Sequence, residues 1–212
     1  MAEKYVSEAV IGRLPRYYRK LCELEERGIE RISSLELSRE MGLNASQIRR
    51  DFNCFGGFGQ QGYGYQVKKL KNELWQILGL DRTYHAVIVG AGNIGRALLN
   101  YRGFSDQGFY IEAIFDINPD LIGKVVDGIT ILSVFEFDEY VKKHNINMGI
   151  ICTPAHNAQD VCDMFARLGI GAVWNFAPCE LTGPKFMEIE NVNLSDSLYI
   201  LAYRMNENKH EA

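Results

Sequence analysis

The chain has 212 residues, of which 47% are apolar and 24% are charged, and its formal net charge is −4. This composition is typical of a folded globular protein of one or two domains, and it excludes a basic coat over the whole surface for nucleic acid. No apolar run approaches the roughly 18 residues that a bilayer span needs.

The cysteines and the first residues predict the compartment. Five cysteines, at positions 22, 54, 152, 162 and 179, are odd in number, scattered and never spaced as CxxC. This pattern suits reduced thiols in a cytosol better than a disulfide framework or a zinc site. The opening MAEKYVSEAV has no apolar core of a secretory signal. We therefore expect a cytoplasmic protein with no membrane partner and no metal site.

Charge divides the chain unevenly. Residues 1–80 contain 13 Lys and Arg against 10 Asp and Glu, whereas residues 81–212 contain 10 against 17. The first segment is thus +3 and the second −7. Such asymmetry is typical of a small nucleic-acid module joined to an acidic domain.

The first segment begins with a helical pattern. Residues 7–27 carry apolar side chains at three- and four-residue spacing, and Ser7 is placed to cap them. Pro15 predicts a kink or a later true start of this helix. Ser33 and Glu36 fit a capping box for a second helix, which stops at Gly42.

A third helix is predicted to begin at Asn44 or Ser46, with Ile48, Phe52 and Phe55 on its inner face. The short spacing between the second and third helices is that of a helix-turn-helix. Residues 56–65, GGFGQQGYGY, then alternate small and aromatic residues as a tight hairpin does. The combination predicts a winged helix.

An amphipathic helix, QVKKLKNELWQILGL, follows the hairpin and ends at Gly79. Its inward residues are expected to be Leu70, Leu74, Ile77 and Leu78. The next residues, LDRTYH, are expected to form a linker.

From residue 85 onward, short apolar runs alternate with helical stretches, which predicts a parallel sheet buried on both faces. We therefore predict an α/β fold with three parts. They are a winged-helix domain at 1–80, a Rossmann domain at 81–194, and a terminal helix with its tail at 195–212. The terminal helix, over 195–207, carries Leu198, Leu201, Ala202 and Met205 on one stripe and needs a surface to dock on.

The sequence Gly90-Ala91-Gly92-Asn93-Ile94-Gly95 follows an apolar strand and opens a helix, as a dinucleotide fingerprint does. Phosphates are expected on the free amides at that helix start. Asp116 ends the second strand, placed for the adenosine ribose hydroxyls, and no arginine follows it to meet a 2′-phosphate. The pattern favours NAD over NADP. Coenzyme A, or a Rossmann domain without a ligand, is the alternative interpretation.

A dehydrogenase would need a proton donor beside the nicotinamide. Of the four histidines, His156 alone is expected at the carboxyl edge of the sheet, and a polar residue at a helix start explains it equally well. Little chain remains for a substrate domain. We therefore expect no catalytic residues and binding without turnover. An NAD-dependent oxidoreductase with an N-terminal dimerisation domain is the alternative.

Polar side chains cover the outer face of the third helix. They are Ser46, Gln47, Arg49, Arg50 and Asn53. Arginine can bind guanine, and glutamine can bind adenine, through two hydrogen bonds each, while serine contacts phosphates. A solvated helix face is the alternative, but the adjoining hairpin favours DNA.

ASQIRRDFNCFGGFGQQGYGY, followed in order by VGAGNIG, FDINP, CTPA and NFAP, closely resembles the Rex family of redox-sensing transcriptional repressors over nearly the whole chain. The resemblance implies a homodimer with an N-terminal winged helix, a C-terminal Rossmann domain and a last helix that swaps into the partner. It also implies binding to AT-rich inverted repeats in double-stranded DNA, from which NADH releases the protein.

Together, the motifs and the resemblance give two sets of expected site residues. The NAD-binding set is Gly90, Ala91, Gly92, Asn93, Ile94, Gly95, Arg96, Tyr101, Asp116, Thr153, Pro154, Asn175, Ala177 and Pro178. The DNA-binding set is Ser46, Gln47, Arg49, Arg50, Asn53, Phe58, Gly59, Gln60, Gln61, Gly62 and Tyr63.

Two positions depart from the family pattern. Family wings usually carry a basic residue where Gln61 stands, so one phosphate contact per subunit is expected to be lost. The family motif ENVD reads Glu190-Asn-Val-Asn193 here. An acid at that position would pair with an arginine of the partner's first helix, for which Arg19 is the candidate. Asn193 can hydrogen-bond to it but cannot form the ion pair.

Overall fold

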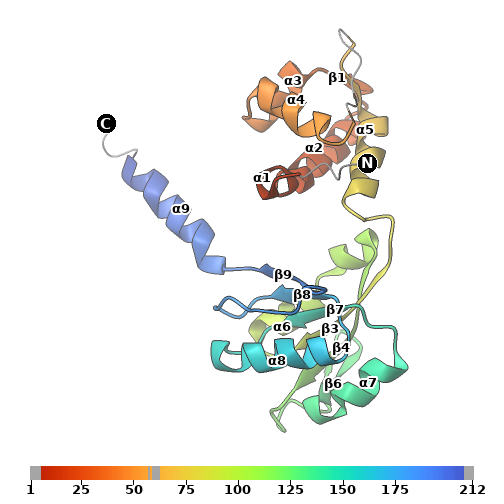
Figure 1. Cartoon of the computed structure of the whole chain (residues 1–212), viewed down its shortest axis with the longest axis vertical. Coiled ribbons are helices and arrows are strands. Elements are labelled where there is room, and N and C mark those ends of the chain that lie inside the picture. The colour runs from red at the N-terminus through yellow and green to blue at the C-terminus, as the bar shows by residue number, and fades with distance from the viewer. Residues whose placement is uncertain (1–5, 57, 59–62, 208–212) are drawn as a thin grey trace. The chain divides into compact units, whose positions relative to one another are not determined.

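The computed structural model describes residues 6–56, 58 and 63–207, which form two compact units, Met1–Arg82 and Thr83–Ala212 (Figure 1). The described elements of the first unit are α1 (Glu8–Ile11), α2 (Leu14–Glu26), β1 (Arg31–Ile32), α3 (Ser34–Met41), α4 (Ala45–Asn53), β2 (Tyr65–Gln66) and α5 (Val67–Ile77). Among all the residues that the structure describes, no helix is both long and apolar enough to cross a membrane.

The predicted first helix is broken in two. Helix α1 ends at Ile11, and α2 starts at Leu14 with Pro15 in its first turn. Proline is tolerated there because its missing N–H would have no partner in the helix, whereas it would break a helix interior. The expectation of a late start at Pro15 is confirmed. Ser7 occupies the N-cap of α1 but makes no side-chain capping bond.

The helix-turn-helix follows the sequence closely. Ser33 accepts from the Glu36 N–H, and Glu36 accepts from the Ser33 N–H, so the capping box is formed. Gly42 ends α3 in the left-handed conformation, which glycine adopts without a steric penalty. Helix α4 then starts behind Asn44, whose side chain accepts from the Ser46 N–H at 2.8 Å.

The core of the first unit joins α2, α4 and α5 through fully buried side chains, including Tyr17, Leu21, Ile48, Phe52, Leu70 and Leu74. The prediction that Ile77 points inward is wrong. It is 37% exposed at the last residue of α5, whereas Leu74 and Leu78 on either side of it pack in the core. Strand β2 pairs antiparallel with β1, a strand too short to give a sequence signal.

The second unit is a Rossmann domain. Its described elements are β3 (Tyr84–Val89), α6 (Asn93–Leu99), η1 (Arg102–Gln107), β4 (Phe109–Asp116), β5 (Val125–Val126), β6 (Ile129–Ser133), η2 (Val134–Glu136), α7 (Phe137–Lys143), β7 (Met148–Ile151), α8 (Ala155–Arg167), β8 (Ala172–Asn175), β9 (Glu188–Asn191) and α9 (Leu194–Glu207).

The strand order is β5-β6-β4-β3-β7-β8-β9. Every pair is parallel except β5 with β6. Leaving out β5, this is the 3-2-1-4-5-6 order of dinucleotide-binding sheets, with the switch between β3 and β7. The predicted α/β class with a winged helix and a Rossmann domain is confirmed, while β5 and β9 were not predicted.

Alternate residues of β3 serve two cores. Val87 and Val89 pack with α7 and α8 on one face of the sheet, and Ala86 and Ile88 pack with α6 on the other (Figure 1). This two-sided burial explains the uninterrupted apolar run in the sequence. The chain direction brings the carboxyl ends of β3, β4 and β7 to one edge, where a ligand site is expected.

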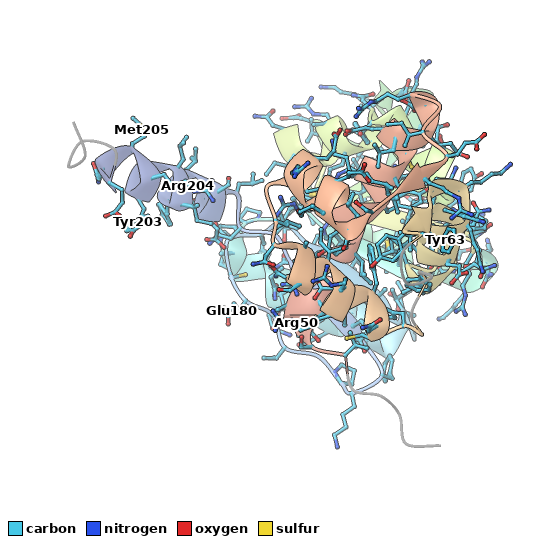
Figure 2. All side chains as sticks on the ribbon, turned by 90° about the horizontal axis from the view of Figure 1, so that it is seen from above. Arg50, Tyr63, Glu180, Tyr203, Arg204 and Met205 are labelled. Carbon is cyan, nitrogen blue, oxygen red and sulfur yellow. The ribbon has the colours of Figure 1, made fainter. Side chains whose placement is uncertain are left out.

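Helix α9 differs from the others because none of its residues is buried. Leu198, Leu201 and Met205 lie on one side, and Tyr199 and Tyr203 lie on another, and all five are more than half exposed. Figure 2 shows Tyr203 and Met205 on different sides of the helix. Exposed apolar side chains on two sides of one helix indicate a surface for interaction with a partner.

Candidate functional site

The loop that joins β3 to α6 uses its three glycines in different ways. Gly90 has a φ of +107°, and a Cβ there would lie 2.6 Å from the Cys152 carbonyl. A Cβ on Gly95 would lie 2.0 Å from the Gly90 oxygen, so the protein's own packing requires both glycines. A Cβ on Gly92 would meet no atom within 4 Å. The space beside Gly92 is therefore open to a ligand.

Asp116 holds the same loop from the end of β4. One carboxylate oxygen accepts from the Ala91 N–H at 2.6 Å, and the other accepts from the Asn118 N–H at 2.8 Å. Each oxygen has a second lone pair for a ligand hydroxyl. The carboxylate thus lies at the mouth of the glycine loop with its orientation fixed.

A cavity of about 650 Å³ opens over the glycine loop at the carboxyl ends of β3, β4, β7 and β8. This volume lies in the range of small-molecule and cofactor sites, roughly 300–1,000 Å³. Of the residues expected from the sequence, seven line it. They are Gly90, Gly92, Ile94, Asp116, Thr153, Pro154 and Pro178.

Two buried groups on the β7 side of the cavity differ in their chemistry. The Thr153 hydroxyl oxygen is buried and has no hydrogen-bond partner among the residues that the structure describes. A ligand atom in the cavity would supply the missing partner, since buried polar groups are rarely left unpaired. Cys152 also lines the cavity, and burial raises the pKa of its thiol to about 12. This thiol is protonated at neutral pH and is a poor nucleophile.

The charges of the cavity favour a particular nucleotide. Its lining, as far as the structure describes it, includes Asp116 and Asp160 and no lysine or arginine. A 2′-phosphate beside Asp116 would therefore meet no cation. Arg96 lies next to the glycine loop and donates to the Gly92 carbonyl at 3.3 Å and to the Asn93 side chain at 3.2 Å. Its positive charge suits a pyrophosphate on that loop.

Seven expected residues lie outside the cavity lining, namely Ala91, Asn93, Gly95, Arg96, Tyr101, Asn175 and Ala177. The Tyr101 side chain is 59% exposed and packs edge-on against Phe104 at 4.7 Å between ring centroids. Asn175 is fully buried, and its amide bonds only to protein groups. His156, on α8, is exposed and outside the lining.

Sequence reasoning missed part of the cavity wall. Leu121, Val134, Cys152, Asn157, Asp160, Val161 and Met164 also line it. The residues on α8 recur at Asn157, Asp160, Val161 and Met164, a three- and four-residue spacing that marks one face of a helix. This spacing in the sequence could have identified the face of α8 that lines the cavity. Among the described residues, no group of His, Cys, Asp or Glu could hold a metal ion.

A second candidate site lies on α4. Ser46, Arg49, Arg50 and Asn53 are exposed and Gln47 is partly exposed, whereas Ile48 and Phe52 are buried. Arg49 donates to the Ser34 hydroxyl at 2.9 Å. Arg50 is exposed, and Figure 2 marks its place. This polar face is the expected one, and it carries two cations.

Asp51 is the charged residue of α4 that points inward. Arg13 donates to both of its oxygens, at 2.7 and 2.8 Å, and the Tyr17 hydroxyl donates at 2.7 Å. Burial raises the pKa of Asp51, but the hydrogen bonds from Arg13 and Tyr17 lower it by more, so it stays ionised. The trio fixes α4 against the start of α2.

The expected wing residues divide into three groups. Phe58 is partly buried and packs edge-on against Phe52 at 5.9 Å, so it belongs to the core. Tyr63 is 71% exposed, and Arg31 donates to its carbonyl at 3.3 Å (Figure 2). Gly59, Gln60, Gln61 and Gly62 lie outside the described residues.

Two family models match the chain. The model for a CoA binding domain matches residues 81–179, and the model for a putative DNA-binding protein N-terminus matches residues 5–53. These matches fall on the second and the first compact unit, respectively.

Curated relatives match nearly the full length. A redox-sensing transcriptional repressor Rex from Clostridium beijerinckii is 52% identical over 206 residues, which cover 97% of this chain and 98% of the relative. The protein of that name from Clostridioides difficile is 50% identical over 209 residues, covering 99% and 100%. The one from Thermoanaerobacter sp. strain X514 is 51% identical over 202 residues, covering 95% and 90%.

Solved structures give the same result. The structure of RSP in complex with β-NAD⁺ and operator DNA has a TM-score of 0.91 at 51% identity, covering 97% of this chain and 94% of that one. RSP in complex with β-NADH has a TM-score of 0.89 at 48% identity, covering 96% of each chain. RSP is described as a Rex-family repressor.

Proposed function

The chain belongs to the Rex family of redox-sensing transcriptional repressors, and we propose that it represses transcription by binding operator DNA and leaves the DNA when its cavity holds NADH. The observation that carries this proposal is the likeness to one solved repressor that binds both β-NAD⁺ and operator DNA. The relatives are repressors and not enzymes.

The proposed division of labour follows the predicted domains. Residues 1–80 bind DNA, residues 81–194 bind the nucleotide, and residues 195–212 join two subunits. The exposed apolar side chains of α9 support a homodimer in which this helix inserts into the partner. A cytoplasmic location follows from the same proposal, since the protein must reach both DNA and the NAD pool.

The DNA interface is proposed on the polar face of α4 and on the wing. Two copies of α4 in a symmetric dimer read half-sites one turn apart, roughly 34–36 Å, of an AT-rich inverted repeat. Gln47 is suited to an adenine edge, and Arg49 and Arg50 are suited to guanine or phosphate. Ser46, Asn53 and Tyr63 complete the described part of the surface. Gly59, Gln60, Gln61 and Gly62, which lie outside the described residues, are expected to extend it, whereas Phe58 supports the wing from the core.

The nucleotide is proposed to lie over Gly92 with its ribose at Asp116, and the lack of a cation in the described lining supports NAD over NADP. The ligand contributes a nicotinamide whose charge depends on its redox state. Pro154, Phe176 and Pro178 form an apolar part of the cavity wall. An apolar wall favours the neutral reduced ring over the cationic oxidised ring.

We propose that the dimer has a closed form, which does not bind DNA, and an open form, which does. If the closed form prefers the reduced ring, NADH shifts the population toward the closed form and away from the DNA-binding form. A coupling of this kind is typically about 1–3 kcal/mol, or roughly 5–150-fold in affinity. No contact between the DNA and the nucleotide is required, because both ligands act on the same conformational equilibrium.

The test is gel retardation of an operator duplex that the pure protein selects from a random-sequence pool. Retardation is expected with the protein alone, and NADH but not NADPH is expected to abolish it. Retardation that is unchanged across micromolar NADH contradicts the proposal.

Two double variants separate the sites. Arg49→Ala with Arg50→Ala is expected to abolish DNA binding and leave NADH binding intact. Lys142→Ala with Lys143→Ala removes two cations from the end of α7, far in sequence from both sites, and is the matched control. It should bind both ligands as the wild type does.

The match to a CoA binding domain favours one other ligand for the same cavity. Calorimetric titration of the dimer with coenzyme A, NAD⁺ and NADH distinguishes them. NADH is expected to bind tightest. If coenzyme A binds more tightly than NADH and also releases the operator, then coenzyme A and not NADH is the effector.

A further inference from the structure

Asn175, at the carboxyl end of β8, is fully buried, and both its side-chain nitrogen and its side-chain oxygen bond to protein groups. Its nitrogen donates to the Cys179 carbonyl at 2.7 Å, to the Asn191 side-chain oxygen at 2.9 Å and, more weakly, to the Ala177 carbonyl at 3.4 Å. Its oxygen accepts from the Ala177 N–H at 2.9 Å. The side chain faces protein groups and not the cavity.

These partners belong to two segments with different roles. The bonds to Ala177 and Cys179 fix the loop over residues 176–179, which contributes Phe176 and Pro178 to the cavity wall. The bond to Asn191 reaches the last residue of β9. One buried side chain is therefore shared by the nucleotide cavity and the strand that leads to α9.

The connection from β9 to α9 contains only two residues, and both are held. The Val192 N–H donates to the Asn175 carbonyl at 2.8 Å. Asn193 accepts from the Ser195 N–H through its side chain at 3.1 Å and from the Asp196 N–H through its carbonyl at 3.2 Å. A displacement at Asn191 thus reaches the first turn of α9 without a flexible loop to absorb it.

We propose that Asn175 and Asn191 are positioning residues that transmit the state of the cavity wall to α9. This inference depends on the proposed function, in which α9 joins the two subunits. A shift of Phe176 and Pro178 around the reduced ring moves the loop, the Asn175 amide follows its bonds to that loop, and Asn191 changes the direction in which α9 leaves the sheet. Both residues act through others and contact neither ligand.

Asn191→Ala is the variant that tests the link. It removes the acceptor on the α9 side and leaves Asn175 its bonds to Ala177 and Cys179. Because Asn191 is exposed on an edge strand, the fold is expected to survive. Asn191→Asp keeps an oxygen in place to accept from Asn175 and is the rescue variant. Asn145→Ala, at an exposed position after α7, is the matched control.

Three quantities are measured for each full-length dimer. They are the NADH affinity without DNA, the operator affinity without NADH, and the factor by which saturating NADH weakens operator binding. For Asn191→Ala, each separate affinity should stay within about threefold of wild type, while the coupling factor falls at least about fivefold toward one. Asn191→Asp and Asn145→Ala should keep the wild-type factor.

The possible outcomes distinguish three cases: Asn191 transmits the state of the cavity to α9, Asn191 has only a structural role, or the proposed function itself fails. A merely structural role would lower the unfolding temperature or both affinities and leave the coupling factor unchanged, and this result overturns the inference. Loss of coupling in Asn145→Ala also overturns it. If the wild type itself shows no coupling, the proposed function fails, independently of Asn191.

Discussion

Gly92 and Gly95 lie three residues apart in one loop, yet a side chain at each position has different consequences. At Gly92 a Cβ meets no atom within 4 Å, whereas at Gly95 it would lie 2.0 Å from a backbone oxygen. The first glycine is therefore free to serve the ligand, and the second serves the fold. The same fingerprint contains both kinds of requirement.

Gly92→Val is expected to block the pyrophosphate and to leave a repressor that ignores NADH. NADH affinity should fall by more than about tenfold, or roughly 1.4 kcal/mol. The unfolding temperature and operator affinity should remain near wild type, because a Cβ at this position meets no protein atom within 4 Å. Calorimetric titration and gel retardation measure these quantities.

Gly95→Ala supplies the contrast, since it should lower the unfolding temperature markedly. Wild-type NADH affinity in Gly92→Val would show that the nucleotide does not lie over this glycine.

Asp51 gives a prediction about pH. Asp51→Asn removes the charge that Arg13 and Tyr17 share, and it should cost about 2–4 kcal/mol of unfolding free energy near neutral pH. The pKa of Asp51 is lowered in the fold, so its contribution is present above the unfolded pKa and is lost as the pH falls through the folded value. The difference between wild type and variant should therefore shrink below about pH 4.

Urea unfolding of the isolated protein at several pH values measures this effect. Tyr17→Phe removes one of the hydrogen bonds that lower the pKa of Asp51 but keeps the charge and the Arg13 pair, so it should cost only about 1 kcal/mol and show a weaker pH dependence over the same range. A constant difference between wild type and Asp51→Asn down to about pH 3 would contradict the assignment.

At the scale of elements, the sequence predicted those with strong periodicity. The capping box of α3, the cap of α4 and the alternation of strands with helices from residue 85 all have local signals. Strand β9 was missed because it is four residues long, and its sequence EIEN is polar at the edge of the sheet. A pattern of burial cannot indicate a strand that is exposed.

The residues of the candidate sites were less predictable from the sequence than the helices and strands. The fingerprint fixes backbone positions, so Gly90, Gly92 and Asp116 lie together at the cavity as expected, and their contact with a nucleotide stays a prediction. Asn175 was expected among the ligand contacts, but its amide is used within the protein, since position at a sheet edge does not determine where a side chain points. The partner of Asp51 could not be predicted, because Arg13 lies 38 residues away.

The prediction at the scale of elements is that helix α9 joins the two subunits. Leu198→Asp with Leu201→Asp places two charges on an apolar side of a helix that has no buried residue in its own chain. Burying a leucine contributes about 1.5–3 kcal/mol, so losing two in each subunit should dissociate a dimer. Sedimentation at micromolar concentration should show a monomer.

Asn206→Asp adds one charge at an exposed polar position of the same helix, and it should remain a dimer. If the double variant sediments as the wild type does, α9 is not the element that joins the subunits.

At the scale of the whole molecule, the uneven charge fits two different ligands. The first 80 residues carry a net +3 and the remainder −7. DNA affinity should fall steeply with salt, because each phosphate contact releases counterions. NADH affinity should depend on salt much less, since the cavity lining carries no described cation and one ligand molecule displaces few ions.

The two ligands must also affect each other equally. If NADH weakens operator binding by a given factor, the operator must weaken NADH binding by the same factor, because both paths lead to the same doubly bound state. Titrating NADH into the dimer with and without saturating operator, and operator into the dimer with and without saturating NADH, gives both factors. They should agree within about twofold and exceed about fivefold. Gly92→Val should bring both factors to one together, since it removes the NADH effect at its origin. Two factors that differ beyond error would mean that NADH and DNA do not act on one shared equilibrium of the dimer.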